Sequence, residues 1–220
     1  MNGTDMVTSI SLNRIKIIPG QRIYLPDLSW AEFEQTLVEL GEKRVTRIAY
    51  CAGELEIRMP LPEHERIKVL ISNLIVVLLE ELDLPWESLG SSTLKNSRMK
   101  AGIEPDDCFY IKNCQAIIGK KRLDLATDPP PDLAIEVDLT SLTQIGAYEA
   151  LGVPEIWRYQ QGKLAIFVLV NGHYLESVTS SLFPTLSIHA GFTRILERSS
   201  GILMSEARKE FRQWVRNNLQ

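Results

Sequence analysis

The fold of this chain is decided by the stretch Pro131-Asp132-Leu133-Ala134-Ile135-Glu136-Val137-Asp138. Residues 133–137 form a compact apolar run introduced by three prolines, which predicts a buried β-strand. Side chains alternate across a strand, so the three aliphatic residues at odd-numbered positions share one face, whereas Asp132, Glu136 and Asp138 share the other. A row of carboxylates therefore follows a strand whose opposite side belongs to the core.

Spacing along the strand decides which of these acids can act together. Glu136 and Asp138 lie about 6.6 Å apart at roughly 3.3 Å per residue, whereas Asp132 lies about 13 Å from Glu136. One metal ion could bridge the first pair, but it could not bind all three carboxylates.

A second acidic element, Pro105-Asp106-Asp107, opens another β-prone run at Cys108 to Ile111. If the two predicted strands pair in antiparallel fashion, the start of one lies near the end of the other. That register would bring Asp106 toward Glu136, so two strands would contribute to one oxygen-rich site.

Clustered carboxylates repel one another, so a folded protein that keeps them close usually holds a cation or shares a proton between them. Hard oxygen ligands suit Mg²⁺ or Mn²⁺. We therefore expect a divalent-metal site built from Asp106, Glu136 and Asp138. The alternative is that these are acids at strand ends that face water.

Outward from this stretch, periodicity predicts an α/β (α+β) chain. Ser29 is a candidate N-cap for a helix over residues 30–40. Alternation around Ala52-Gly53 predicts a hairpin over 45–59, and Asn171-Gly172 is a strong hairpin signal. The other predicted elements are strands at 14–18, 155–159, 163–170 and 174–178, an apolar helix at 64–82, a short helix at 142–151 with Thr140 and Ser141 as caps, and an amphipathic helix at 202–218.

The length of 220 residues and the apolar content of 45% predict one domain with a sizeable core. We expect an N-terminal arm at 1–27, a main domain at 28–200 and a C-terminal helix at 201–220 packed on the same domain. No apolar run is long enough to cross a bilayer, and residues 1–11 do not resemble a secretory signal, so the expected location is cytoplasmic. Three scattered cysteines match neither a disulfide framework nor a zinc pattern.

The net charge of −4 argues against a protein that coats nucleic acid through its overall charge. Nucleic-acid binding would need a local basic patch, and the alternative is an ordinary solvated surface. The candidate patch comprises Lys95, Arg98, Lys100, Lys112, Lys120, Lys121 and Arg122.

Several segments together resemble a known family. In chain order they are Gly53-Glu54-Leu55, Pro62 with His64, Glu104-Pro105-Asp106, residues 131–137, and Tyr148 through Gly152-Val153-Pro154-Glu155-Ile156-Trp157. This ordered set resembles the Uma-type family of restriction endonucleases, within the PD-(D/E)xK nuclease-like superfamily. The resemblance covers roughly residues 28 to 200.

The resemblance implies a restriction-endonuclease-like fold, in which helices flank a mixed central β-sheet. It also implies that Asp106, Glu136 and the carbonyl of Val137 hold the metal. The superfamily's lysine, two residues after the glutamate, is replaced here by Asp138. Gln144 stands at the position on the next helix where some relatives carry that lysine instead. The charge that would stabilise the phosphate must then come from elsewhere, and Lys95, Lys100 and Lys112 are candidates.

The leading hypothesis is a Mg²⁺-dependent (or Mn²⁺-dependent) endonuclease that hydrolyses DNA, by default as a homodimer. His64 could orient a phosphate or a water, or it could cap the long helix. Glu54 and Glu65 are weaker candidates for an acid at the outer edge of the metal site. Trp157, Tyr148 and Tyr159 are expected in the core. One rival is a catalytically impaired scaffold that binds nucleic acid or protein; another is an enzyme acting on a small phosphorylated molecule.

Overall fold

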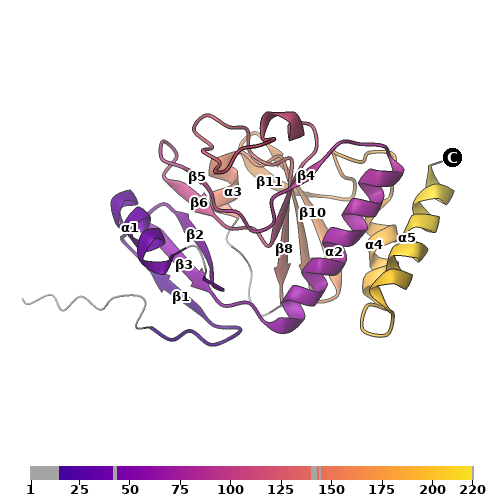
Figure 1. Cartoon of the computed structure of the whole chain (residues 1–220), viewed down its shortest axis with the longest axis horizontal. Helices are drawn as coiled ribbons and strands as arrows, with labels where there is room; N and C mark the ends of the chain where they lie inside the picture. Colours follow the sequence, from indigo (N-terminus) through magenta and orange to yellow (C-terminus); the bar gives the residue numbers. More distant parts are fainter. Residues whose placement is uncertain (1–14, 42–43, 140–142, 144, 220) are drawn as a thin grey trace, which may run out of the picture.

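The computed structural model describes residues 15–41, 44–139, 143 and 145–219, and it contains two β-sheets flanked by helices (Figure 1). The helices and strands, in chain order, are β1 (Arg22–Leu25), α1 (Trp30–Leu40), β2 (Arg47–Cys51), β3 (Glu54–Arg58), α2 (Pro62–Glu81), β4 (Glu87–Ser88), β5 (Leu94–Asn96), β6 (Ala101–Ile103), β7 (Asp107–Tyr110), the 3-10 helix η2 (Cys114–Ala116), β8 (Leu133–Asp138), α3 (Gly146–Leu151), β9 (Glu155–Gln160), β10 (Lys163–Val170), β11 (His173–Ser177), α4 (Ile188–Leu196) and α5 (Met204–Asn218). The predicted α+β class is confirmed.

The first sheet has the strand order β1-β3-β2-β6-β5, and each neighbouring pair is antiparallel. Its core against α1 is formed by Phe33 and four strand residues, Ile48, Tyr50, Leu55 and Ile57. Ser29 caps α1 as expected, and Glu32 completes a capping box with it. Ala52 and Gly53 have φ of 51° and 88°, as a tight two-residue hairpin turn requires. The predicted helix and hairpin are therefore confirmed.

The second sheet has the strand order β11-β10-β9-β8-β7-β4 and is mixed. β8 is antiparallel to β7 and parallel to β9, with α3 in the connection that the parallel pair requires. Leu133, Ile135 and Val137 pack into the largest apolar cluster, whereas Ala134 packs on the opposite side. This confirms both the mixed central sheet and the predicted two-faced strand.

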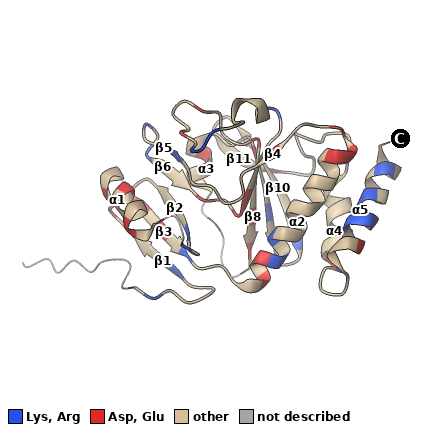
Figure 2. Ribbon diagram, viewed as in Figure 1, with Lys and Arg blue, Asp and Glu red and all other residues tan. Residues whose placement is uncertain are grey.

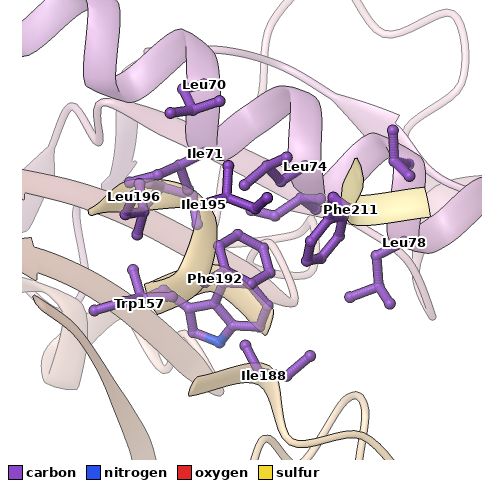
Figure 3. Close-up of a cluster of buried hydrophobic side chains, with 14 of the residues drawn as sticks. Leu70, Ile71, Leu74, Leu78, Trp157, Ile188, Phe192, Ile195, Leu196 and Phe211 are labelled. Atoms are coloured by element: carbon purple, nitrogen blue, oxygen red, sulfur yellow. The ribbon is translucent and has the colours of Figure 1, made fainter. Parts of the chain in front are cut away.

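Helices α2, α4 and α5 form the layer that packs with the aliphatic face of β8 (Figures 1 and 3). The rings of Trp157 and Phe192 meet edge to face at 5.1 Å, and Phe192 meets Phe211 at 4.9 Å. Ion pairs hold α5 on α2 at 2.6 Å, from Arg212 to Glu80 and from Arg216 to Glu81. Figure 2 shows basic bands along α5. The C-terminal helix thus packs on the core of the same domain.

In the described residues, no helix has the length and apolar character needed to span a bilayer. Cys51, Cys108 and Cys114 are free thiols, in agreement with the absence of a disulfide framework in the sequence. Trp157, Tyr148 and Tyr159 are buried, as expected of core residues.

Four details differ from the sequence-based expectations. Residues 15–18 are not in a strand; the first strand is Arg22–Leu25, which pairs with β3. The long helix begins at Pro62 rather than at His64, because Pro is favoured in the first turn of a helix. The short helix begins at Gly146, and its proposed caps Thr140 and Ser141 lie outside the described residues. Strand β6 and helix α4 were not predicted.

Glycine at position 191 is required by the contact between α4 and α5. A Cβ at this position would lie 2.5 Å from the ring of Trp214. Gly191→Ala should therefore destabilise the protein by about 1–3 kcal/mol in chemical denaturation, although alanine favours a helix. Gly201→Ala is the matched control, because its Cβ would lie 3.8 Å from the Arg198 carbonyl oxygen, which is an ordinary van der Waals contact. Equal stability of both variants would contradict this packing.

Candidate active site

The register of β7 against β8 places two acids side by side. Asp107 pairs with Ile135, so Asp106 lies next to Glu136. The backbone N–H of Asp106 donates to the Ile135 carbonyl at 3.1 Å, and that of Val137 donates to Asp106 Oδ2 at 2.7 Å. The antiparallel register expected from the sequence is confirmed, and it fixes Asp106 from both its backbone and its side chain.

Glu136 projects from β8 into a fully buried polar pocket. The hydroxyl of Tyr148, on α3, donates to Glu136 Oε1. Thr143 Oγ1 lies 3.2 Å from Glu136 Oε2 and 2.7 Å from Asp138 Oδ1. Tyr148 is thus a core residue whose polar end holds the orientation of the acid.

A buried arginine on β3 joins the two acids. Arg58 Nη2 lies 2.8 Å from Glu136 Oε2 and 3.3 Å from Asp106 Oδ1, and the residue is only 8% exposed. Its Nη1 donates to Thr143 Oγ1. The sequence analysis missed this residue. The available signal was a charged side chain at the end of a strand, Glu54–Arg58, that alternates between apolar and charged residues.

His64 is a first-turn residue of α2 and contacts Asp106 directly, with its Nε2 2.8 Å from Asp106 Oδ2. The residue at the N-cap position is Leu61, so the capping role suggested for His64 is wrong. His64 Nδ1 is buried without a hydrogen-bond partner and lies 3.7 Å from Glu65 Oε1. His64 therefore belongs to the site through its bond to Asp106.

Asp138 faces a different set of partners from the Asp106–Glu136 pair. It accepts a hydrogen bond from the Thr143 backbone N–H at 2.9 Å. Arg158 Nε lies 3.3 Å and Arg22 Nη2 lies 3.7 Å from its carboxylate oxygens. Asp138 is thus neutralised by arginines from β9 and β1, and Arg58 is not among its ion-pair partners.

Burial and neighbouring charges shift the pKa values of Asp106 and Glu136 in opposite directions. Burial raises the pKa of Asp106, but Arg58 and His64 outweigh it and hold that pKa below its ordinary value. Burial raises the pKa of Glu136 to about 8; Arg58 opposes this rise, and repulsion from Asp106 and Asp138 adds to it. Neighbouring acids with separated pKa values are typical of reactive sites.

The other candidates lie apart from this pair or have other partners. Asp132 Oδ2 accepts three backbone N–H bonds, from residues 111–113, so its role is structural. Lys95 pairs with Glu34, and Lys100 and Lys112 are exposed. None of the contacts described for these lysines reaches Asp106 or Glu136. Gln144 lies outside the described residues, and Glu54 is half-buried at the start of β3.

A small cleft of about 30 Å³ opens next to the acids, with room for roughly one or two water molecules. Its lining includes Arg22, Arg58, His64 and Val137. Its polar lining therefore carries two arginines and a histidine, and it adjoins the residues that hold Asp106 and Glu136. Both arginines are paired with buried acids, Arg22 with Glu56 and Asp138, and Arg58 with Asp106 and Glu136.

The donor set suits a hard divalent ion, because it offers two carboxylates from adjacent strands. However, Arg58 lies between these carboxylates, and no group of three or more His, Cys, Asp or Glu side chains in the described parts of the chain is placed to hold an ion. The types of ligand therefore fit Mg²⁺. The ion and the Arg58 guanidinium cannot both lie between the two carboxylates.

This arrangement of strands and acids defines an α+β protein with a buried carboxylate site between two adjacent strands. The chain belongs to the Uma2 family, described as "Putative restriction endonuclease", which matches residues 30–199. No curated protein matches the chain significantly. A solved structure from Anabaena variabilis, described as "a putative nuclease belonging to DUF820", is 13% identical with a TM-score of 0.48, and the match covers 84% of this chain and 99% of that one.

Proposed function

We propose that this protein is an endonuclease that hydrolyses phosphodiester bonds of DNA at the Asp106–Glu136 pair. The observation that carries the proposal is the register of β7 and β8, which brings both acids together in one buried site next to a small cleft lined by Arg22 and Arg58. Membership of the family supports the same reaction class. The expected form is a cytoplasmic homodimer, so that both DNA strands can be cut.

Asp106, Glu136 and the carbonyl of Val137 would hold Mg²⁺ or Mn²⁺. When bound, such an ion lowers the pKa of a coordinated water and polarises the phosphate. Asp138 was expected as a further ligand, but its contacts with Thr143, Arg158 and Arg22 favour a role in neutralising these arginines.

The protein's own residues supply orientation and charge. Tyr148 and Thr143 fix the Glu136 carboxylate, and His64 fixes Asp106. Arg58 provides the positive charge that the superfamily's lysine position lacks here. A guanidinium stays protonated, so Arg58 can bind and stabilise a phosphate but cannot act as a base.

A plasmid assay tests this proposal. Purified protein should cut supercoiled DNA with Mg²⁺ or Mn²⁺, and excess EDTA should abolish the cutting. Asp106→Asn should be inactive, whereas Asp124→Asn, which changes an exposed loop acid, should cut like the wild type. Cleavage that persists in EDTA or in Asp106→Asn would refute the assignment.

The second candidate function is a scaffold that binds DNA without cutting it. Its support is that every oxygen of Asp106 and Glu136 already contacts a protein donor, and that the net charge is −4. This reading predicts a mobility shift of DNA by the protein, with no cleavage under any metal condition.

A further inference from the structure

Arg58 takes the place in the acid pair that a cation would occupy. Asp106 Oδ1 faces Arg58, while Oδ2 accepts from the Val137 backbone N–H and contacts His64. Glu136 Oε2 accepts from Arg58, and Oε1 accepts from Tyr148. Each oxygen of the pair therefore already contacts a donor, and Arg58 supplies a tethered positive charge between the two acids.

A divalent ion bound between Asp106 Oδ1 and Glu136 Oε2 would take the position that the Arg58 guanidinium occupies. The guanidinium and the ion carry charges of the same sign, and in a buried site their repulsion is only weakly screened. Binding of one therefore disfavours the other, unless Arg58 has a second place to go.

The structure contains such a place. Glu56 is buried on the same strand, two residues before Arg58 and hence on the same face. Its Oε1 accepts from Arg22 at 2.8 Å, whereas its Oε2 is buried without a hydrogen-bond partner. An unpaired buried carboxylate oxygen is costly, so it is a favourable acceptor for a displaced guanidinium.

We propose that Arg58 is an internal competitor of the metal ion, which leaves Asp106 and Glu136 for Glu56 Oε2 when the ion binds. This inference rests on the proposed function, because it assumes that the acid pair is the metal site. Arg58 then sets the affinity of the site for metal and keeps the acids neutralised while no ion is bound.

Calorimetric titration with Mn²⁺ tests the competition. Arg58→Gln removes the charge but keeps an amide that can donate to the acids, and it should bind Mn²⁺ at least about tenfold more tightly than the wild type. Lys95→Gln is the matched control: it also removes one positive charge, from a pair with Glu34, and should leave the affinity unchanged.

A double-mutant cycle tests the second position of Arg58. Glu56→Gln should weaken Mn²⁺ binding at least about threefold in the wild type, because the displaced arginine loses its acceptor. The same substitution should have no effect in Arg58→Gln. An equal loss in both backgrounds would mean that Glu56 acts through its charge alone, and it would overturn the second position.

The possible results of these titrations distinguish a failure of this inference from a failure of the proposed function. If the wild type shows metal-dependent cleavage but Arg58→Gln has wild-type affinity, the competition is refuted and the nuclease assignment stands. If no variant binds metal, both fail. If Arg58→Gln is unfolded without metal, millimolar Mn²⁺ should restore its thermal unfolding transition, and failure to restore it refutes the competition.

Discussion

Glu136→Gln is expected to reduce metal-dependent DNA cleavage by at least about a thousandfold, the scale on which loss of one central charged group acts in a water-excluded site. Glutamine keeps the shape of the side chain and can still accept from Tyr148, but it removes the negative charge that would hold the ion. Because Glu136 is fully buried between two strands, no exposed acid can replace it. Metal binding in calorimetry should be lost together with cleavage.

Single-turnover cleavage of a labelled duplex measures this effect, and circular dichroism checks that the variant is folded. Glu34→Gln is the matched control, because it neutralises a glutamate in a half-buried pair with Lys95, away from the acid pair, and should change neither rate nor fold. Retention of wild-type cleavage by Glu136→Gln would remove Glu136 from the reaction.

Asp132→Ala should have the opposite phenotype to Glu136→Gln: it should lose stability but keep the metal site. This is expected although Asp132 lies on the same face of the same stretch of chain as Glu136. Its Oδ2 accepts the backbone N–H groups of Ile111, Lys112 and Asn113 at 2.7, 2.9 and 3.2 Å. Alanine would leave these donors without the buried acceptor that fixes the turn, which should cost roughly 3–5 kcal/mol of stability. The metal affinity of the folded fraction should stay unchanged.

Urea denaturation followed by tryptophan fluorescence gives the free energy of unfolding for this comparison. Asp124→Ala provides the control, because that exposed acid makes one side-chain bond of 3.0 Å, to the Ala126 N–H, and its loss should cost less than about 1 kcal/mol. A stable Asp132→Ala protein that fails to bind metal would show that Asp132 belongs to the site.

The strands that carry the acids were predictable because their signals are local. Prolines isolate β8, its aliphatic residues alternate, and the acidic element before β7 fixes where Asp106 can lie. The hairpin β2–β3 and helix α1 were found for the same reason, since a turn and an N-cap mark them. Each of these predictions depends on neighbours in sequence.

The features that were not predicted from the sequence depend on contacts between distant segments. Arg58 reaches Glu136 across 78 residues, and no spacing rule connects a hairpin to that acid. Strand β6 contains Gly102, which weakens a strand signal; the structure uses it because a Cβ there would lie 2.8 Å from the Phe33 ring. Helix α4 contains Gly191, which lowers helix propensity but admits Trp214.

Two of the three arginines that contact the acids, Arg22 and Arg58, come from the first sheet, whereas Arg158 comes from the second sheet together with the acids of β8. Arg22 and Arg58 are direct neighbours on β1 and β3, whereas Glu136 and Asp138 lie on β8. Neighbouring arginines repel within their own sheet, as do the acids within theirs, and each set is stabilised by the other. Ion pairs therefore join the two sheets: a fragment that lost residues 22–58 would keep Asp106, Glu136 and Asp138 but would lose Arg22 and Arg58, so the N-terminal sheet is part of the candidate site rather than an accessory to it.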